Sequence, residues 1–304
     1  MRQKKFGLSG LLVLLVLLTG CAASRLDEAK KQYALALATR AETSLSHYKA
    51  ALEELDAAIA REPNLWQAYA LRGLIHANLD DSDNAITDLD LAQQGSFEGK
   101  LQWVPLVMNL TYGDIFHRRA GAAIRDGVWD RAKSYQETAL QFFTSVMNTA
   151  SNNAGVMAQG DELGVAMQDL AVKAHTRWAA GTFQMAVIVG KSESKARQNE
   201  LLQEVSARLS TVLESYPQAA ALRYYLADSY RKQALTIAKT SPAESAQLQA
   251  KALSQLRVCG ELGLPQGLRE PAAQLFHLLS KGAETEVEMK LRGDAAPETL
   301  PAPQ

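Results

Sequence analysis

The chain has 304 residues, of which 47% are hydrophobic and 21% are charged, and its formal net charge is -1. A chain with these values can bury a substantial core, in one large domain or two smaller ones, and is not disordered. The charge balance excludes nucleic-acid binding, because proteins of that class need a surplus of Lys and Arg to displace counterions from phosphates.

The amino terminus reads as an export signal. Three basic residues, Arg2, Lys4 and Lys5, precede an apolar stretch over residues 8–18. That stretch suits the core of a signal peptide but is shorter than the ~20 residues that a membrane-spanning helix needs. We therefore expect residues 1–20 to be removed on export, which changes the formal charge of the chain from -1 to -4.

The apolar stretch ends in a short motif, Leu18-Thr19-Gly20-Cys21. The motif resembles the lipobox of bacterial lipoproteins, whose cysteine is lipidated and becomes the first residue of the mature chain. The resemblance implies a diacylglyceryl thioether and an acylated amine, with acyl groups such as palmitate, at Cys21. Several acyl chains hold a protein durably on a membrane, because each buried CH2 contributes about 0.8 kcal/mol. The alternative is an ordinary secretory signal with a coincidental cysteine.

The residue that follows Cys21 bears on the destination of such a lipoprotein. Ala22 stands where an Asp would indicate retention in the inner membrane of enteric-type bacteria. By this resemblance we expect a lipid-anchored protein of the bacterial cell envelope, in the outer membrane and facing the periplasm.

The pattern from Ala22 to about residue 282 predicts an all-α fold. Strong helix formers dominate, apolar residues recur three and four positions apart, and most prolines fall between the periodic stretches. Helices are expected over 24–45, 48–61, 65–79, 82–94, 101–126, 128–149, 160–189, 194–215, 218–239, 243–262 and 268–281.

The clearest internal repeat runs from Trp66 to Ala92 and is preceded by Pro63-Asn64. It resembles a tetratricopeptide repeat (TPR), the 34-residue helix–turn–helix unit that stacks into solenoids. The family uses small residues where paired helices touch. The resemblance assigns such packing positions to Gly73, Ala85, Leu89, Ala92, Ala120, Ala132, Ala139 and Ala227.

The repeats beyond residue 150 depart from the family in length. The fold expected is therefore a stack of antiparallel helix pairs, a TPR-like α-solenoid that is irregular in its C-terminal half. The alternative is an irregular helical bundle with fortuitous small residues. The expected domains are a signal peptide at 1–20, a TPR-like domain at 21–150, a second, degenerate half at 151–282 and a disordered Pro-rich tail at 283–304.

Stacked helix pairs share a core and leave an extended concave surface lined by the first helix of each pair. Such a surface suits an extended peptide or a carboxylate-bearing ligand, so the expected partner is an envelope protein or peptide. The alternative is that these side chains form ordinary solvated surface. The candidate partner-binding residues are Gln67, Asn78, His117, Arg125, Tyr224, Asp228, Arg231 and Lys232.

Motifs that carry reaction chemistry are not found in the sequence. The five histidines lack the i, i+4 spacing of metal ligands, and there is no Gly-rich phosphate loop or G-x-S-x-G elbow. We expect a protein that is not an enzyme, has no cofactor or metal, and acts as a scaffold in envelope assembly or secretion. Two alternatives remain: a solute-binding helical lipoprotein resembling the T component of TRAP transporters, and an enzyme whose site only the fold assembles. The oligomeric state is left open.

Overall fold

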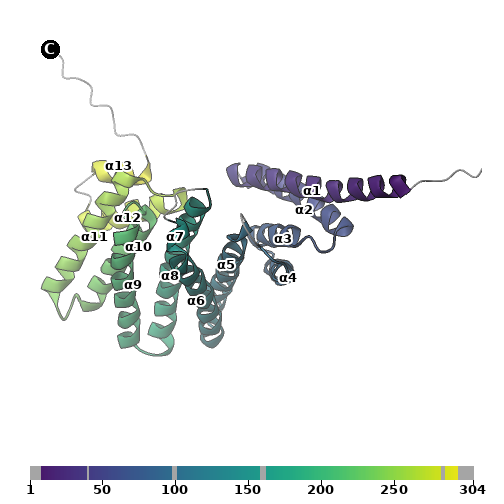
Figure 1. The fold of residues 1–304 in the computed structure, drawn as a ribbon. Helices are drawn as coiled ribbons and strands as arrows, with labels where there is room; N and C mark the ends of the chain where they lie inside the picture. The colour runs from purple at the N-terminus through teal and green to yellow at the C-terminus, as the bar shows by residue number, and fades with distance from the viewer. Residues whose placement is uncertain (1–7, 40, 98–100, 158–161, 282–284, 294–304) are drawn as a thin grey trace, which may run out of the picture. The chain divides into compact units, whose positions relative to one another are not determined.

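The structure is a computed structural model that describes residues 8–39, 41–97, 101–157, 162–281 and 285–293. All regular structure in these ranges is helical, and consecutive helices pack as antiparallel pairs (Figure 1). The prediction of an all-α fold built from stacked helix pairs, solenoid-like in its arrangement, is confirmed.

The contacts between residues divide the chain into two compact units, Met1–Ile115 and Phe116–Gln304. The division falls inside helix α5 (Val104–Arg125), whereas the sequence favours a boundary near residue 150. Near residue 150 the structure has helix α6 (Trp129–Asn152), the single turn α7 (Ala154–Met157) and helix α8 (Glu162–Ser192). Because α6 and α8 pack against each other, this segment is a connection within the second unit.

Unit 1 contains α1 (Leu8–Ala38), α2 (Ala41–Arg61), α3 (Trp66–Asn78) and α4 (Ser82–Ala92). The helices α1 and α2 pack together, as do α3 and α4, and α2 also contacts α3. The buried side chains at the centre of this packing are Leu26, Ala29, Ala51, Leu55, Ala68 and Ile75.

The first break between helices differs from the expected one. The pattern predicts that one helix ends at residue 45 and the next begins at 48, whereas α1 ends at Ala38 and α2 begins at Ala41. The earlier turn lets the buried stripe of α1 face the buried stripe of α2, and Ser44 Oγ donates to the backbone O of Ala36 at 2.8 Å across the turn. This tertiary pairing outweighs local helix propensity.

Unit 2 follows a repeating scheme. After α8 come α9 (Lys195–Ser215), α10 (Ala220–Ile237), α11 (Pro242–Leu262) and α12 (Gln266–Ser280). The helix α8 packs on α6 and on its own partner α9. The helix α10 packs on both α8 and α9 and on its partner α11. The helix α12 then contacts α10 and α11. Each new pair therefore covers the apolar side left by the previous pair.

Local signals in the sequence explain several helix ends. The side chain of Ser194, the N-cap residue of α9, accepts a hydrogen bond from the backbone N–H of Arg197 at 3.1 Å. Pro242 occupies the first turn of α11. Gly127 and Gly263 have positive φ values of 73° and 77° at turns, a conformation that glycine adopts without steric cost.

The expected disordered tail at 283–304 needs a correction. Within it the structure has a helix, α13 (Thr285–Arg292), which contacts α11 and α12. Leu291 is 1% exposed, and the Glu288 carboxylate accepts from His277 at 2.8 Å. A helix this short gains its stability from packing, which the local sequence does not reveal. Residues 294–304 lie outside the described part of the chain.

Candidate binding surface

The predicted packing positions are buried in the structure. A Cβ atom added to Gly73 in α3 would come within 2.9 Å of Leu89 Cγ and 3.1 Å of the backbone O of Ala85, both in α4. A side chain at this position would therefore require Leu89 or the backbone of α4 to shift. The other seven positions have no exposed surface: Ala85, Leu89, Ala92, Ala120, Ala132, Ala139 and Ala227.

Unit 1 holds two of the candidate partner-binding residues, Gln67 and Asn78. Gln67 is half-buried in the first turn of α3, and Asn78 is exposed at its end, where its side-chain N–H donates to the Tyr33 hydroxyl at 3.3 Å. These two residues lie at opposite ends of one helix. The structure therefore does not bring them into a common site.

A charged network in unit 1 was not anticipated from the sequence. The Arg72 guanidinium donates twice to the buried Asp88 carboxylate, at 2.8 and 2.7 Å, and once to Asp56 at 2.6 Å. These hydrogen bonds raise the pKa of Arg72. Because the three residues come from α3, α4 and α2, the network fixes three helices to one another.

In unit 2, His117 and Arg125 lie on α5. The His117 ring pairs with the fully buried Gln136 of α6 through Nδ1 and Oε1 at 3.0 Å, and its backbone O accepts from Gln184 of α8 at 3.4 Å. His117 is thus part of a polar contact among three helices. Arg125 is exposed in the last turn of α5, two turns further along.

The four remaining candidates gather on α10. Asp228 is only 9% exposed and accepts from Arg231 Nε at 3.0 Å and from Lys232 Nζ. Its position one turn before both cations explains this geometry, because side chains three and four residues apart share a helix face. Tyr224 lies one turn before Asp228 on the same face.

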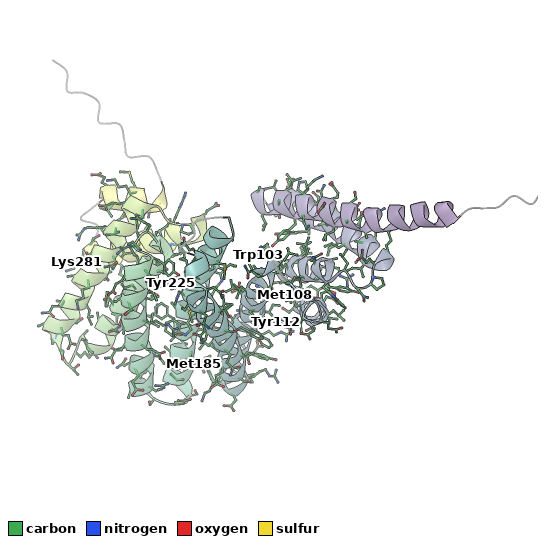
Figure 2. All side chains as sticks on the ribbon, in the orientation of Figure 1. Trp103, Met108, Tyr112, Met185, Tyr225 and Lys281 are labelled. Atoms are coloured by element: carbon green, nitrogen blue, oxygen red, sulfur yellow. The ribbon has the colours of Figure 1, made fainter. Side chains whose placement is uncertain are left out.

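Two aromatic side chains complete this group. Phe183 of α8 lies 6.0 Å from Tyr225 of α10, centroid to centroid, and Tyr225 meets Tyr224 edge-on at 5.2 Å. Figure 2 labels Tyr225 on α10. Lys232 Nζ stands 4.3 Å from the centroid of the Phe183 ring, a cation–π contact that joins α10 to α8.

The environment changes the acid–base properties of this group. Burial raises the pKa of Tyr224 to about 12, with a further contribution from the negative charge of Asp228. Burial also lowers the pKa of Lys232, although the Asp228 carboxylate opposes the shift. At neutral pH the group combines two cations with one carboxylate, so it carries an excess of one positive charge.

Two exposed apolar side chains extend this group along both helices. Val187 is 43% exposed one turn after Phe183 on α8, and Leu235 is 61% exposed one turn after Arg231 on α10. We name the combined set the α8–α10 surface. Its exposed members are Val187 and Leu235, its half-buried members are Tyr224, Tyr225, Arg231 and Lys232, and its buried members are Phe183 and Asp228. It combines cationic, aromatic and apolar groups on two neighbouring helices.

Sequence reasoning missed Phe183, Val187, Tyr225 and Leu235. Val187 and Leu235 fit the apolar spacing of their helices, which predicts burial, and only the packed structure shows them exposed. A signal was present for Tyr225, because it adjoins the candidate Tyr224. No signal connects Phe183 to α10, since 42 residues separate it from Tyr225.

Hollows in the described residues are open grooves. One of about 450 Å3 is lined by Gln168, Asp169 and Val172 of α8 and by the connection 215–219. Another, of about 660 Å3, follows one face of α6 from Glu137 to Asn152. Neither groove includes a candidate residue.

Other findings concern membrane and metal chemistry. Among the residues that the structure describes, no group of three His, Cys, Asp or Glu side chains could hold a metal ion. In that same part of the chain, no helix combines the length and the apolar character that crossing a membrane requires. Cys259 is fully buried, and burial raises the pKa of its thiol to about 12.

The fold defines an all-α protein made of stacked antiparallel helix pairs. Comparison of the chain with known protein families and with curated proteins finds no match.

Proposed function

We propose that this protein is a membrane-anchored periplasmic lipoprotein that binds a protein or peptide partner and acts as a scaffold in cell-envelope assembly or secretion. In this proposal lipid on Cys21 holds the chain on the outer membrane, and TPR-like helix pairs form the scaffold. The lipobox resemblance supports the anchor, and the stacked helix pairs are compatible with the repeat resemblance.

The α8–α10 surface is the observation that supports binding most strongly. Aromatic and Arg side chains dominate the energetic centres of protein interfaces, and here they adjoin two exposed apolar side chains. A solitary exposed leucine is ordinary, but Leu235 lies one turn after Arg231 on α10, and the exposed Val187 lies one turn after Phe183 on α8.

The chemistry of the surface indicates what the partner presents. The excess positive charge favours a carboxylate, and the Lys232 ammonium is held beside the Phe183 ring. The exposed side chains of Val187 and Leu235 favour an apolar residue next to that carboxylate. We therefore expect a peptide segment with an apolar side chain adjacent to an acidic group or a chain terminus.

Affinity capture of the tagged, full-length lipoprotein from detergent-solubilised envelope extracts tests this function. The informative variant is Leu235→Glu. The Leu235 side chain is 61% exposed, so the change leaves the core intact, and the added negative charge repels the expected carboxylate of the partner. The matched control is Leu278→Glu, which alters an equally exposed leucine, 66% exposed, on α12 of the same unit.

The wild type and Leu278→Glu should recover the same partner protein, and Leu235→Glu should lose it. Equal recovery by all three proteins would remove the α8–α10 surface from the proposal. A lack of any protein partner, together with a rise in melting temperature caused by a small organic molecule, would instead favour a solute-binding lipoprotein.

A further inference from the structure

The start of the expected mature chain is packed into a helix pair. Ala22 has no exposed surface, Leu26 is 5% exposed, and Ala29 again has none. All three lie in α1, which includes Cys21 and continues without a break to Ala38. A flexible tether between the lipid-bearing residue and the folded domain is therefore absent from this described stretch.

Side-chain pairs fix the register between α1 and α2. Arg25 Nη1 lies 2.7 Å from the carboxylate of Glu54, and the side chain of Gln32 pairs with His47 at 2.8 Å. Each step forward along α1 thus corresponds to an equal step backward along α2, as in any antiparallel helix pair.

Continuing this register by one turn sets the backbone of Cys21 level with Ala58. The helix α2 does not end there but runs on to Arg61, about 4.5 Å further at 1.5 Å per residue. The turn over residues 62–65 comes next and leads into α3, which contacts α1. Along the axis of α1, this turn lies at or beyond the level of Cys21, on the side where the signal segment leaves.

We propose that the α2–α3 turn, residues 62–65, rests on phospholipid headgroups when Cys21 carries its lipid. This inference rests on the anchor in the proposed function. Acyl chains on Cys21 must enter the bilayer at this end of α1. Because the next residue, Ala22, is already packed in the helix pair, no flexible segment lets the domain move away from the membrane. Unit 1 is then held against the membrane by its own helix packing.

The side chains at this end suit a headgroup layer. Arg61, Glu62, Pro63 and Asn64 are exposed, and together they carry one positive and one negative charge. Trp66, the first residue of α3, is half-buried with its ring 6.2 Å from Tyr69. Tryptophan is favoured at membrane–water interfaces because its ring is apolar with one polar N–H.

The near neutrality of this end has a consequence for lipid choice. Anionic lipids attract polybasic segments, and this turn is not one. Contact with the surface should therefore depend on the lipid anchor and persist in vesicles of phosphatidylcholine alone as well as in vesicles that include phosphatidylglycerol.

The test uses the full-length lipidated protein, reconstituted into such vesicles, with a fluorophore on one introduced cysteine. The probe position is Asn64→Cys, in the turn, and the matched control is Asp83→Cys, an exposed position in the first turn of α4. The helix α3 separates them by about 20 Å, since it has 13 residues. Cys259 is buried, which protects it from the label, and the sulfur of a lipidated Cys21 is already a thioether.

A quencher attached to lipid headgroups should remove most of the fluorescence at position 64 and leave position 83 unchanged. Insertion of a flexible Gly/Ser linker between Cys21 and Ala22 should abolish the quenching while the protein still floats with the vesicles. Equal quenching at both positions in a floating protein would overturn the headgroup contact and leave the anchor intact. A protein that does not float would refute the anchor itself, and this inference with it.

Discussion

A single glycine, Gly73, sets the distance between α3 and α4, the helix pair whose sequence resembles a tetratricopeptide repeat. Gly73 faces Leu89 and Ala85 so closely that any side chain must displace one of them. Replacing it by leucine adds four carbons at that crossing, so Gly73→Leu should destabilise the protein by about 1–3 kcal/mol through overpacking. Denaturant unfolding followed by circular dichroism measures the change.

The matched control for this substitution is Thr87→Leu, on the exposed face of α4, where the Thr87 hydroxyl donates to the backbone O of Asp83 in the same helix. It should change stability by less than about 0.5 kcal/mol, as most surface substitutions do. A Gly73→Leu protein as stable as this control would remove close packing as the role of the glycine.

A buried histidine makes stability depend on pH. His175 of α8 is 8% exposed, its Nδ1 has no hydrogen-bond partner in the described part of the chain, and burial lowers its pKa from 6.5 to about 4, aided by the charge of Arg208. The Arg208 guanidinium lies 4.6 Å from the centroid of the Trp178 ring, and Trp178 follows His175 by three residues on α8. The imidazole is therefore neutral in the folded protein at physiological pH.

Because the folded pKa is depressed, the unfolded chain binds the proton first as the pH falls. The contribution of His175 to stability is complete above pH 6.5 and declines between pH 6.5 and about 4, by on the order of 2–3 kcal/mol. His175→Gln should abolish that decline while leaving the rest of the acid profile in place. Parallel profiles for the wild type and His175→Gln would show that the histidine does not titrate in this range.

At the scale of helices, α13 shows why packing outweighs local composition. The segment holds eight residues, four of them charged, which favours a solvated tail by sequence alone. Its Leu291 is buried with the residues of α11 and α12, so Leu291→Ala should cost about 2–5 kcal/mol.

Hydrogen exchange measures this prediction directly. Leu291→Ala should speed exchange at the amides of α12, because that helix loses part of its cover. Lys290→Ala, which alters an exposed neighbour, is the control and should leave the α12 amides as they are. Unchanged exchange in Leu291→Ala would mean that α13 does not stabilise its neighbours.

Some helix boundaries are set by local residues such as caps and prolines, and others are not. The start of α9 at Lys195 and of α11 at Pro242 follows a Ser cap and a proline that the sequence displays. The turn between α1 and α2 has neither Gly nor Pro, and Thr39, three residues before Glu42, donates its hydroxyl to the backbone O of Leu35. Its place depends on the register of the two helices.

At the scale of the whole molecule, the proposed anchor makes location depend on one residue, Cys21. Cys21→Ala should release the protein from the membrane fraction or leave the signal segment uncleaved, because alanine has no sulfur to carry the diacylglyceryl group. Fractionation with metabolic palmitate labelling measures both results. Normal cleavage with retained label would refute the anchor.

The partner-binding candidates illustrate the limit of inference along the chain. Tyr224, Asp228, Arg231 and Lys232 could be grouped from spacing alone, because one helix carries all four. Gln67 and Asn78 belong to unit 1, whereas those four residues belong to unit 2. No pattern in the sequence shows whether residues of two different units share a surface.

The sequence by itself determined that the chain is helical and where most helices begin and end. These properties follow from propensity, periodicity and capping, which act over a few residues. The close contact at Gly73 was expected from the repeat resemblance. Only the tertiary structure decided the register of α1 on α2, the helical state of residues 285–292 and the meeting of Phe183 with Lys232. Each of these depends on side chains distant in the chain, whose mutual burial no local pattern specifies.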